Sequence, residues 1–498
     1  MEFASVAFIW AFLPLALIAF YALAPLKDPT QRIKLQNICL LGFSYLFYMW
    51  AGVKALLLLL LLTTGNYGAG IWIDSAPENE GNKQRKRRLI VSLLLNVLLL
   101  AFFKYTGMIL SLAEIFLAPH DSFRSLVVSL LKCESAGAAQ LRRIAMPLAI
   151  SFLVFQSISY LCDVYSRKTR AEKNWFIFAL YLSFFAQMTQ GPIMRFQDLG
   201  TQLKSRSSSW EQFASGVRRF CFGLGKKVII ANTVASAADR IWGMNVLDLC
   251  TAEAWLGTLL YTLQIYYDFS GYSDMAVGIG RMFGIELSEN FDYPYTSLSV
   301  QEFWRRWHIS LSSWFRDYIY IPLGGNRGGL TRTLLNLFVV FLVTGIWHGA
   351  NLTFICWGLL FAFLSIFERL FLGKLLKRNP IKPINWAYAI FAVSMGWVLF
   401  RAPSLYHALK YYGIMFRYVP AGPGASIVSY FDPELLAALV FGVLFAGLVQ
   451  RPLKKRYEII RDYAPIQVLE MLASLAVFVW SLIMIVAGSY NPSIYGAF

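Results

Sequence analysis

The chain has few charged residues and lacks the common motifs of soluble enzymes. Only 15% of its 498 residues are Asp, Glu, Lys or Arg, whereas a soluble globular protein carries about 25%. No Walker lysine motif, H-x-x-x-H pair or G-x-S-x-G elbow occurs, which argues against a P-loop NTPase, a zincin and an α/β-hydrolase. The six cysteines form no C-x-x-C pair, so we expect neither a disulfide framework nor a metal site.

The chain is instead rich in apolar and aromatic residues. Hydrophobic residues make up 57% of it, aromatic residues 16%, and the mean hydropathy is +0.54. These values predict an all-α polytopic membrane protein, with residues 1–498 forming a single integral-membrane domain. The formal net charge is +17, but the basic residues fall in short clusters between apolar runs. This pattern favours lipid head groups as partners and argues against nucleic acid.

Hydropathy predicts about eleven transmembrane helices. Basic loops at residues 27–34, 83–88 and 167–173 fall on the same side of this arrangement, which the positive-inside rule assigns to the cytoplasm. Twelve apolar runs are the candidates for these roughly eleven spans: residues 4–25, 37–51, 53–73, 89–110, 144–165, 174–190, 252–269, 333–348, 352–372, 386–400, 433–449 and 468–488.

Other segments do not have the pattern of a simple span. Residues 111–143 are expected to form an external amphipathic excursion. Residues 212–240, which carry Arg218, Arg219, Lys226 and Lys227 on a helical pattern, are expected to form an interfacial helix on the cytoplasmic side. Residues 268–300 mix Gly, Pro, acids and aromatics. We expect irregular, re-entrant backbone there, surrounded by protein or by a water-filled cavity. The glycines at 278–284 miss the dinucleotide-binding spacing and indicate helix packing, and Pro322–Gly329 is expected to be a turn between two helices.

Two of the four histidines, His308 and His348, lie in strongly apolar and aromatic stretches. A titratable group at bilayer depth usually has a function, and imidazole transfers protons near neutral pH. If residues 301–317 form one helix, Trp304, His308, Leu311 and Phe315 share a face. That helix could also be an interfacial anchor whose histidine is merely hydrogen-bonded. His348 ends an uncharged span, so its imidazole should stay mostly neutral and able to accept a proton.

These motifs carry a family resemblance. The stretches FWRRWHISLS at 303–312, WFRDYIYIPLGGN at 314–326 and GIWHGAN at 345–351 resemble the signature of the membrane-bound O-acyltransferase family. Within it they are similar to the bacterial branch of the alginate O-acetyltransferase membrane-subunit type. Supporting stretches are residues 102–105, the run from 150 to 165, and residues 190–193, 267–276 and 396–401.

The resemblance implies a ring of helices around a central tunnel in the bacterial inner membrane. It also implies transfer of an acetyl group from cytoplasmic acetyl-CoA to hydroxyls of an extracytoplasmic polysaccharide, directly or through an extracytoplasmic acetyltransferase partner. No tightly bound cofactor and no metal are expected. The acceptor polymer stays open among alginate, cellulose, another exopolysaccharide and peptidoglycan.

The family pattern also implies roles for individual residues. His348 is expected to be the general base, and His308 to orient the acyl donor or to stabilise the oxyanion together with Asn351. Arg305, Arg306 and the basic loops could attract the phosphates of coenzyme A. The candidate residues for binding the donor or substrate are Trp304, Arg305, Arg306, Asn351, Asp268, Ser270 and Tyr272.

Two functions without acyl-transfer chemistry stay open from the residues alone. The first is a transporter or flippase of an exopolysaccharide export system, in which the histidines relay protons. Transporters often contain paired repeats with broken helices in both halves, whereas here the irregular segment and both histidines lie between about 268 and 351. The second is a structural scaffold for such a complex, in which His348 has no special role.

Overall fold

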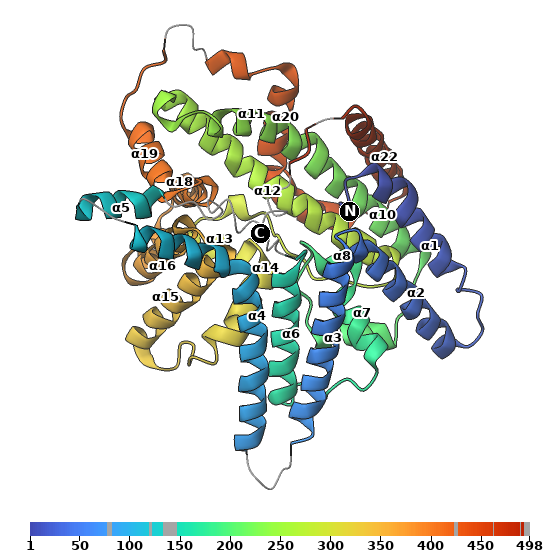
Figure 1. Ribbon diagram of the computed structural model, residues 1–498. Helices are drawn as coiled ribbons and strands as arrows, with labels where there is room; N and C mark the ends of the chain where they lie inside the picture. Colours follow the sequence, from blue (N-terminus) through green and yellow to red (C-terminus); the bar gives the residue numbers. More distant parts are fainter. Residues whose placement is uncertain are drawn as a thin grey trace.

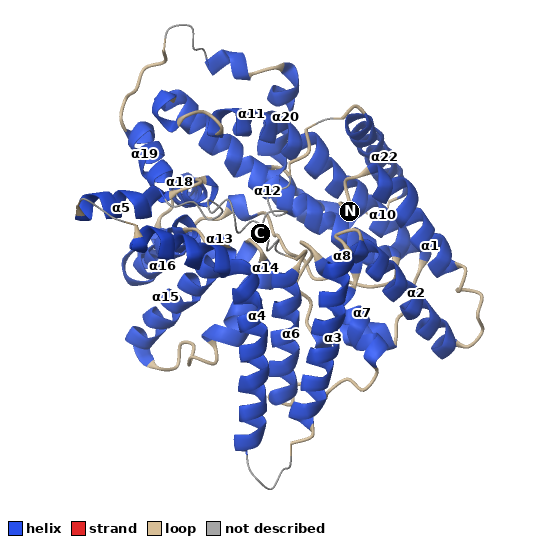
Figure 2. Ribbon diagram, in the orientation of Figure 1, coloured by secondary structure: helices blue, strands red, loops and turns tan. Residues whose placement is uncertain are grey.

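The computed structural model describes residues 1–76, 82–118, 122–132, 147–422, 427–461, 463–488 and 490–492. All regular elements in these ranges are helices (Figure 2), which confirms the predicted all-α class. Within them, six helices are long and apolar enough to cross a membrane, or seven if one bent pair counts as a span. These helices show a multi-pass membrane protein, in which hydrogen bonds inside each helix satisfy the backbone.

The first half of the chain forms a series of helices that ends at the long helix α12 (Figure 1). Its elements are η1 (Phe8–Phe12), α1 (Leu13–Tyr21), α2 (Pro29–Met49), α3 (Val53–Asp74), α4 (Asn82–Leu117), α5 (Phe123–Lys132), α6 (Ile150–Tyr165), α7 (Trp175–Ser183), α8 (Phe185–Met188), α9 (Phe196–Lys204), α10 (Trp210–Gly225), η3 (Lys226–Asn232), α11 (Thr233–Trp242), η4 (Val246–Asp248) and α12 (Thr251–Met282).

The second half contains both histidines of interest. Its elements are η5 (Pro294–Thr296), α13 (Val300–Arg306), α14 (Ile309–Phe315), η6 (Arg316–Tyr320), α15 (Gly329–His348), α16 (Leu352–Phe367), η7 (Glu368–Leu372), α17 (Gly373–Arg378), α18 (Lys382–Arg401), α19 (Leu405–Phe416), η8 (Ile427–Tyr430), α20 (Pro433–Val443), η9 (Leu444–Leu448), α21 (Gln450–Ile460) and α22 (Ala464–Val486).

Most predicted spans coincide with helices, but several of these helices are short. Residues 4–25 correspond to a 14-residue apolar helix, Phe8–Tyr21, and residues 144–165 to the 16-residue helix α6. A straight crossing needs about 20 residues, so the count of about eleven spans stays a prediction. Of the excursion at 111–143, the end of α4 and α5 are described, whereas residues 119–121 and 133–146 lie outside the described residues.

The prediction of one span at residues 174–190 is wrong. The helix ends after Ser183, because Phe184 leaves the helical conformation with φ −53° and ψ 113°, and α8 has only four residues. The residues from Phe178 to Met188 are buried inside the protein. Since other helices surround this segment, it does not need the length that a helix in contact with lipid requires.

The segment around residues 268–300 is more regular than predicted. Residues 268–282 continue α12, a 32-residue helix, and only the part after Met282 lacks long helices. The acids that suggested irregular backbone pair with a neighbouring helix. Asp274 contacts Arg219 and Lys226 at 2.6 Å each, and Asp268 pairs with Lys227.

The same contacts correct the interfacial interpretation of residues 212–240. This segment is part of a continuous helix, α10–η3–α11, that packs along α12 (Figure 1). Arg219, Lys226 and Lys227 pair with acids of α12, and Arg218 lies 3.7 Å from Glu470 of α22. These charges are therefore neutralised by neighbouring helices and not by lipid head groups. Close approach depends on facing glycines: a Cβ added at Gly278 would lie 2.6 Å from the carbonyl oxygen of Gly216. The glycines near 278 therefore pack helices, as predicted.

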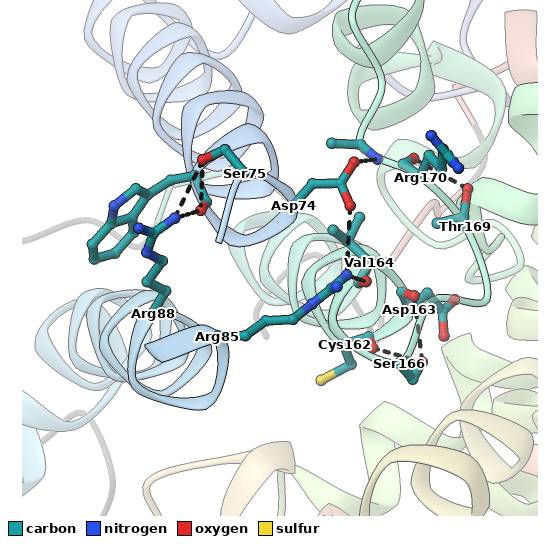
Figure 3. Close-up of polar contacts among 12 residues, drawn as sticks. Asp74, Ser75, Arg85, Arg88, Cys162, Asp163, Val164, Ser166, Thr169 and Arg170 are labelled. Atoms are coloured by element: carbon teal, nitrogen blue, oxygen red, sulfur yellow. Dashed lines mark hydrogen bonds and ion pairs between the residues drawn. The ribbon is translucent and has the colours of Figure 1, made fainter. Parts of the chain in front are cut away.

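Polar contacts join α3, α4 and α6 at one end of these three adjacent helices (Figures 1 and 3). The buried Arg85 donates to the carbonyl oxygen of Val164 at 2.6 Å and lies 3.5 Å from Asp74, which also accepts from the backbone N–H of Ala171 at 3.3 Å. These contacts bring the basic loops at 83–88 and 167–173 to the same end of the protein, as the charge pattern predicts.

Candidate active site

His308 lies at a break between two short helices. Its backbone has φ 45° and ψ 55°, the left-handed region that residues with a Cβ seldom adopt, and α14 begins at the next residue. The predicted common face of Trp304, His308, Leu311 and Phe315 is therefore wrong, because the helix axis is interrupted at Trp307 and His308. The strained turn is held on both sides, since Trp307 N–H donates to Phe303 and Ile309 N–H donates to the carbonyl oxygen of Asn290, both at 2.9 Å.

The His308 side chain is held by Asn290. Nδ1 of the imidazole lies 3.1 Å from Oδ1 of Asn290, and the same oxygen accepts hydrogen bonds from the backbone N–H and the hydroxyl of Ser310, at 3.2 and 2.9 Å. Phe269 packs edge-on against the ring, with 4.7 Å between centroids. His308 is 2% exposed, and its Nε2 atom has no hydrogen-bond partner among the described residues.

His348 is the last residue of α15, and aromatic rings surround it. Trp357 of α16 and Phe400 of α18 pack edge-on against the imidazole, at 4.9 and 5.1 Å between centroids, and Trp347 lies at 4.6 Å. In the described part of the chain, no hydrogen bond reaches either ring nitrogen of His348. The side chain is 6% exposed. Its position therefore depends on packing, and both nitrogens are available to a ligand.

Close packing of α15 and α16 positions His348 (Figure 1). A Cβ added at Gly345 would lie 2.5 Å from the carbonyl oxygen of Phe354, and one at Gly358 would lie 2.5 Å from that of Phe341. Only glycine permits this approach, which brings the rings of α16 against the end of α15.

The two histidines belong to one aromatic cluster. Trp307, next to His308, lies 5.0 Å from Trp397, and Trp397 lies 5.7 Å from Phe400, which contacts His348. The structure thus brings together the two histidines that the sequence separates by 39 residues.

Lys104 and Tyr105 of α4 hold the end of α15, a role that sequence reasoning did not assign to them. The Lys104 ammonium donates to the carbonyl oxygen of Trp347 and lies 5.3 Å from the centre of its ring, and the Tyr105 hydroxyl donates to the carbonyl oxygen of Ile346. The last carbonyls of a helix lack partners within the helix and favour a cation. The sequence feature that could have indicated this role is the position of Lys104 inside the predicted apolar span at residues 89–110.

Asn290 is the second residue that the sequence analysis did not single out. It stands in the stretch Asn290-Phe291-Asp292-Tyr293-Pro294, where the mixture of polar, aromatic and Pro residues was noted. A polar amide in such a setting was the available signal, but its partner could not be read from the chain.

Four of the predicted donor-site residues lie close in the chain to one of the two histidines. Trp304, Arg305 and Arg306 are on α13, just before His308, and Asn351 precedes α16, just after His348. Trp304 packs against Trp357 at 5.5 Å, and its indole N–H has no partner among the described residues. Arg305 is exposed. Arg306 is already paired, with Glu302 at 2.9 Å and Asp292 at 2.7 Å. Asn351 begins α16, where it accepts from Thr353 N–H at 3.1 Å and donates to the carbonyl oxygen of Pro403 at 2.6 Å.

The other three predicted donor-site residues lie on α12. Asp268 pairs with Lys227, Ser270 is buried, and Tyr272 stacks on Phe3 at 4.5 Å with its hydroxyl against Thr189. The α12 side chain that contacts His308 is Phe269, between two of them. No cluster of three or more His, Cys, Asp or Glu side chains that could hold a metal ion occurs in the described ranges. The roles of all seven residues in substrate binding stay predictions.

Comparison with known proteins extends the resemblance to most of the chain. The membrane-bound O-acyltransferase family matches residues 40–409. A probable alginate O-acetylase of Pseudomonas putida is 37% identical, covering all of both chains, and that of Pseudomonas syringae pv. tomato is 40% identical, covering 84% of this chain and 76% of its own. A peptidoglycan O-acetyltransferase of Helicobacter pylori is 35% identical, covering 81% and 77%.

Proposed function

This chain belongs to the membrane-bound O-acyltransferase family and is an O-acyltransferase, and from that premise we propose that it transfers an acetyl group from cytoplasmic acetyl-CoA to hydroxyls of an extracytoplasmic polysaccharide. Relatives named for alginate and for peptidoglycan support acetyl as the group and a glycan as the acceptor. For the acceptor, we propose a polysaccharide outside the cell that carries free hydroxyl groups, without naming one polymer.

The arrangement of His348 carries the proposal. Its imidazole is enclosed by aromatic rings and carries no hydrogen bond to either nitrogen from the described residues. It also belongs to the aromatic cluster that contains Trp307, the residue next to the buried His308. Such apolar surroundings favour the neutral form of the imidazole. A neutral imidazole with a free lone pair is the group that a general base requires.

In the proposed reaction, His348 accepts the proton of the acceptor hydroxyl while the oxygen forms a bond to the thioester carbonyl carbon. The carbonyl oxygen becomes an oxyanion. When the tetrahedral intermediate collapses, the carbon–sulfur bond breaks, and the thiolate of coenzyme A takes the proton from the His348 imidazolium. The histidine is then neutral again, so it needs no other proton source.

The oxyanion needs hydrogen-bond donors near His348. Trp347 and Trp357 border the imidazole, and the indole N–H of each has no partner among the described residues. Asn351, in contrast, uses its amide N–H on Pro403. The geometry therefore favours the two indoles over Asn351 for this role.

The phosphates of the donor would be attracted by basic side chains at the end of the protein where α3, α4 and α6 meet (Figure 3). Arg88 and Arg170 lie there, close to the loop that carries Lys168, whereas the buried Arg85 is already paired with Asp74 and the carbonyl oxygen of Val164. Arg306 would first have to release Glu302 and Asp292, so we propose the exposed Arg305 as the better phosphate contact of that pair.

We propose the bacterial inner membrane as the location of the protein, because the proposed transfer starts from a donor inside the cell and ends on a polymer outside it. Transfer occurs either directly to the sugar or through an extracytoplasmic acetyltransferase. Co-purification of the tagged protein from membranes, followed by identification of bound extracytoplasmic proteins, tests the second route: a transferase should be recovered with the wild-type protein.

The decisive experiment compares single-histidine variants of the purified protein in nanodiscs. Radiolabelled acetyl-CoA is supplied together with alginate, cellulose oligosaccharides or peptidoglycan fragments. We expect His348→Ala to abolish transfer while the protein stays folded, and His308→Ala to cause a smaller loss. His407→Ala is the matched control: this histidine of α19 stacks on Trp242 at 5.9 Å, and its loss should leave transfer unchanged.

Retained transfer in His348→Ala would refute the base assignment. Movement of a labelled glycan across a sealed vesicle, with no covalent acetylation of any acceptor, would instead support the transport alternative. If neither occurs with the wild-type protein and its co-purified partners, the proposed function is wrong.

A further inference from the structure

The contacts around Asn290 define the protonation pattern of His308. Asn290 is 1% exposed, and its side-chain oxygen faces three groups: Nδ1 of His308, the backbone N–H of Ser310 and the hydroxyl of Ser310. The backbone N–H of Ser310 can only donate. The Asn290 atom that it reaches must therefore be the amide oxygen and not the amide nitrogen.

An amide oxygen carries no hydrogen, so the contact with His308 requires a proton on Nδ1. In a neutral imidazole, one nitrogen carries the proton and the other the lone pair. Nε2 of His308 is consequently the lone-pair atom. It is buried and has no partner among the described residues, and a buried acceptor of this kind usually has a partner in the working state of a protein.

The family resemblance leaves two roles open for His308: orienting the acyl donor or stabilising the oxyanion. This protonation pattern favours the first. A lone pair at Nε2 cannot donate a hydrogen bond to an oxyanion, but it can accept one from a substrate. A coenzyme A thioester offers a suitable donor close to its sulfur, because an amide N–H follows two methylene groups away. The acceptor hydroxyl is not available for this contact, since His348 takes its single proton.

We propose that Asn290 is a positioning residue that fixes His308 as a hydrogen-bond acceptor at Nε2, and that this atom accepts a hydrogen bond from the amide N–H nearest the thioester of the acyl donor. The proposal rests on the proposed function for its substrate, but not for the protonation pattern of His308. His308 thus orients the donor, while His348 carries the proton transfer.

The first test needs no turnover. Protein labelled with ¹⁵N-histidine is studied by NMR in nanodiscs, and the His308 signals are identified by their loss in His308→Gln. We expect a protonated Nδ1 and an unprotonated Nε2. The pattern should persist in Asn290→Asp, whose carboxylate also accepts, and in Ser310→Ala, which removes only one other donor to the same oxygen. It should be lost in Asn290→Leu.

The second test compares S-acetyl-N-acetylcysteamine with its ester analogue, in which oxygen replaces the amide N–H. The wild-type protein should have a KM for the amide compound lower by up to about tenfold, as expected for one uncharged hydrogen bond. Asn290→Leu should lose this preference through KM, with a smaller change in kcat. Asn290→Asp and Ser310→Ala should keep it.

A proton found on Nε2 of His308 in the wild-type protein would overturn the proposal, whatever the activity. So would an equal KM for the two donors in an active wild-type protein, or an unchanged preference in Asn290→Leu. If Asn290→Leu does not fold, the wild-type protonation pattern and donor preference still decide. Absence of any acetyl transfer, with the expected pattern at His308, would instead count against the proposed function alone.

Discussion

Replacing Gly345 by Ala should reduce catalysis far more than stability. Gly345 lies one turn before His348 on α15, at a position where that helix packs closely against α16. The added methyl group would lie 2.5 Å from the carbonyl oxygen of Phe354 and 3.2 Å from Cα of Gly358. Both atoms belong to the backbone, so no flexible side chain can move aside.

The size of the effect follows from these distances. Ordinary contact begins at 3.4 Å, so the two helices must separate by about 0.9 Å at this point. The α15–α16 packing presents Trp357 of α16 to the His348 ring, so separating the two helices moves the imidazole relative to a ring that holds it. A misplacement of about 1 Å at a reacting group lowers the rate by roughly 100-fold. Overpacking costs about 1–3 kcal/mol, but Ala restores about 1 kcal/mol of helix propensity, so the net loss of stability should be about 0–2 kcal/mol.

The assay measures kcat for acetyl transfer and thermal unfolding of the same nanodisc preparation. Gly68→Ala of α3 is the matched control, because a Cβ at that position meets nothing within 4 Å. This variant should keep the wild-type kcat and gain up to about 1 kcal/mol of stability. A kcat within about twofold of the wild-type value in Gly345→Ala, with the control unchanged, would refute the claim that this helix contact positions His348.

Three further predictions concern stability. Gly278→Ala should destabilise the protein by about 1–3 kcal/mol, because its Cβ would lie 2.6 Å from the Gly216 carbonyl, whereas Gly42→Ala has open space; equal thermal unfolding temperatures would contradict this. Lys227→Met should cost about 1.5–3 kcal/mol in denaturation experiments, because Asp268 and the carbonyl oxygen of Pro492 both lose the Lys227 ammonium; a loss below about 0.5 kcal/mol would contradict a stabilising role for this buried ion pair. Arg85→Met should cost about 1.5–3 kcal/mol through the lost bond to the Val164 carbonyl, and Arg87→Met, at an exposed position two residues along the same helix, should cost clearly less; equal losses would argue against the role of the Arg85 contact.

Long apolar runs could be assigned from the sequence with good boundaries. The run predicted at 53–73 is the helix Val53–Asp74, and the run predicted to end at 348 is the helix Gly329–His348. The reason is local: in a bilayer the backbone must satisfy its own hydrogen bonds, and a helix does so without reference to the rest of the chain.

The wrong predictions concerned two charged segments, residues 212–240 and 268–300. Asp268 and Asp274 suggested irregular backbone, and Lys226 and Lys227 suggested a helix at the head groups. In the structure these residues neutralise one another across two packed helices. Whether a charge is solvated by water or by a partner on another helix depends on a contact between residues 41 or more positions apart, which no local pattern reveals.

The sequence alone determined that this is a helical membrane protein and that His308 and His348 are its two histidines in apolar surroundings. Only the tertiary structure decided how each imidazole is held: His308 by Asn290, 18 positions earlier in the chain, and His348 by rings of α16 and α18, with Lys104 on the helix end that carries it. Residue type sets which proton chemistry is possible. The position of the lone pair depends on hydrogen bonds and packing that exist only after the helices assemble.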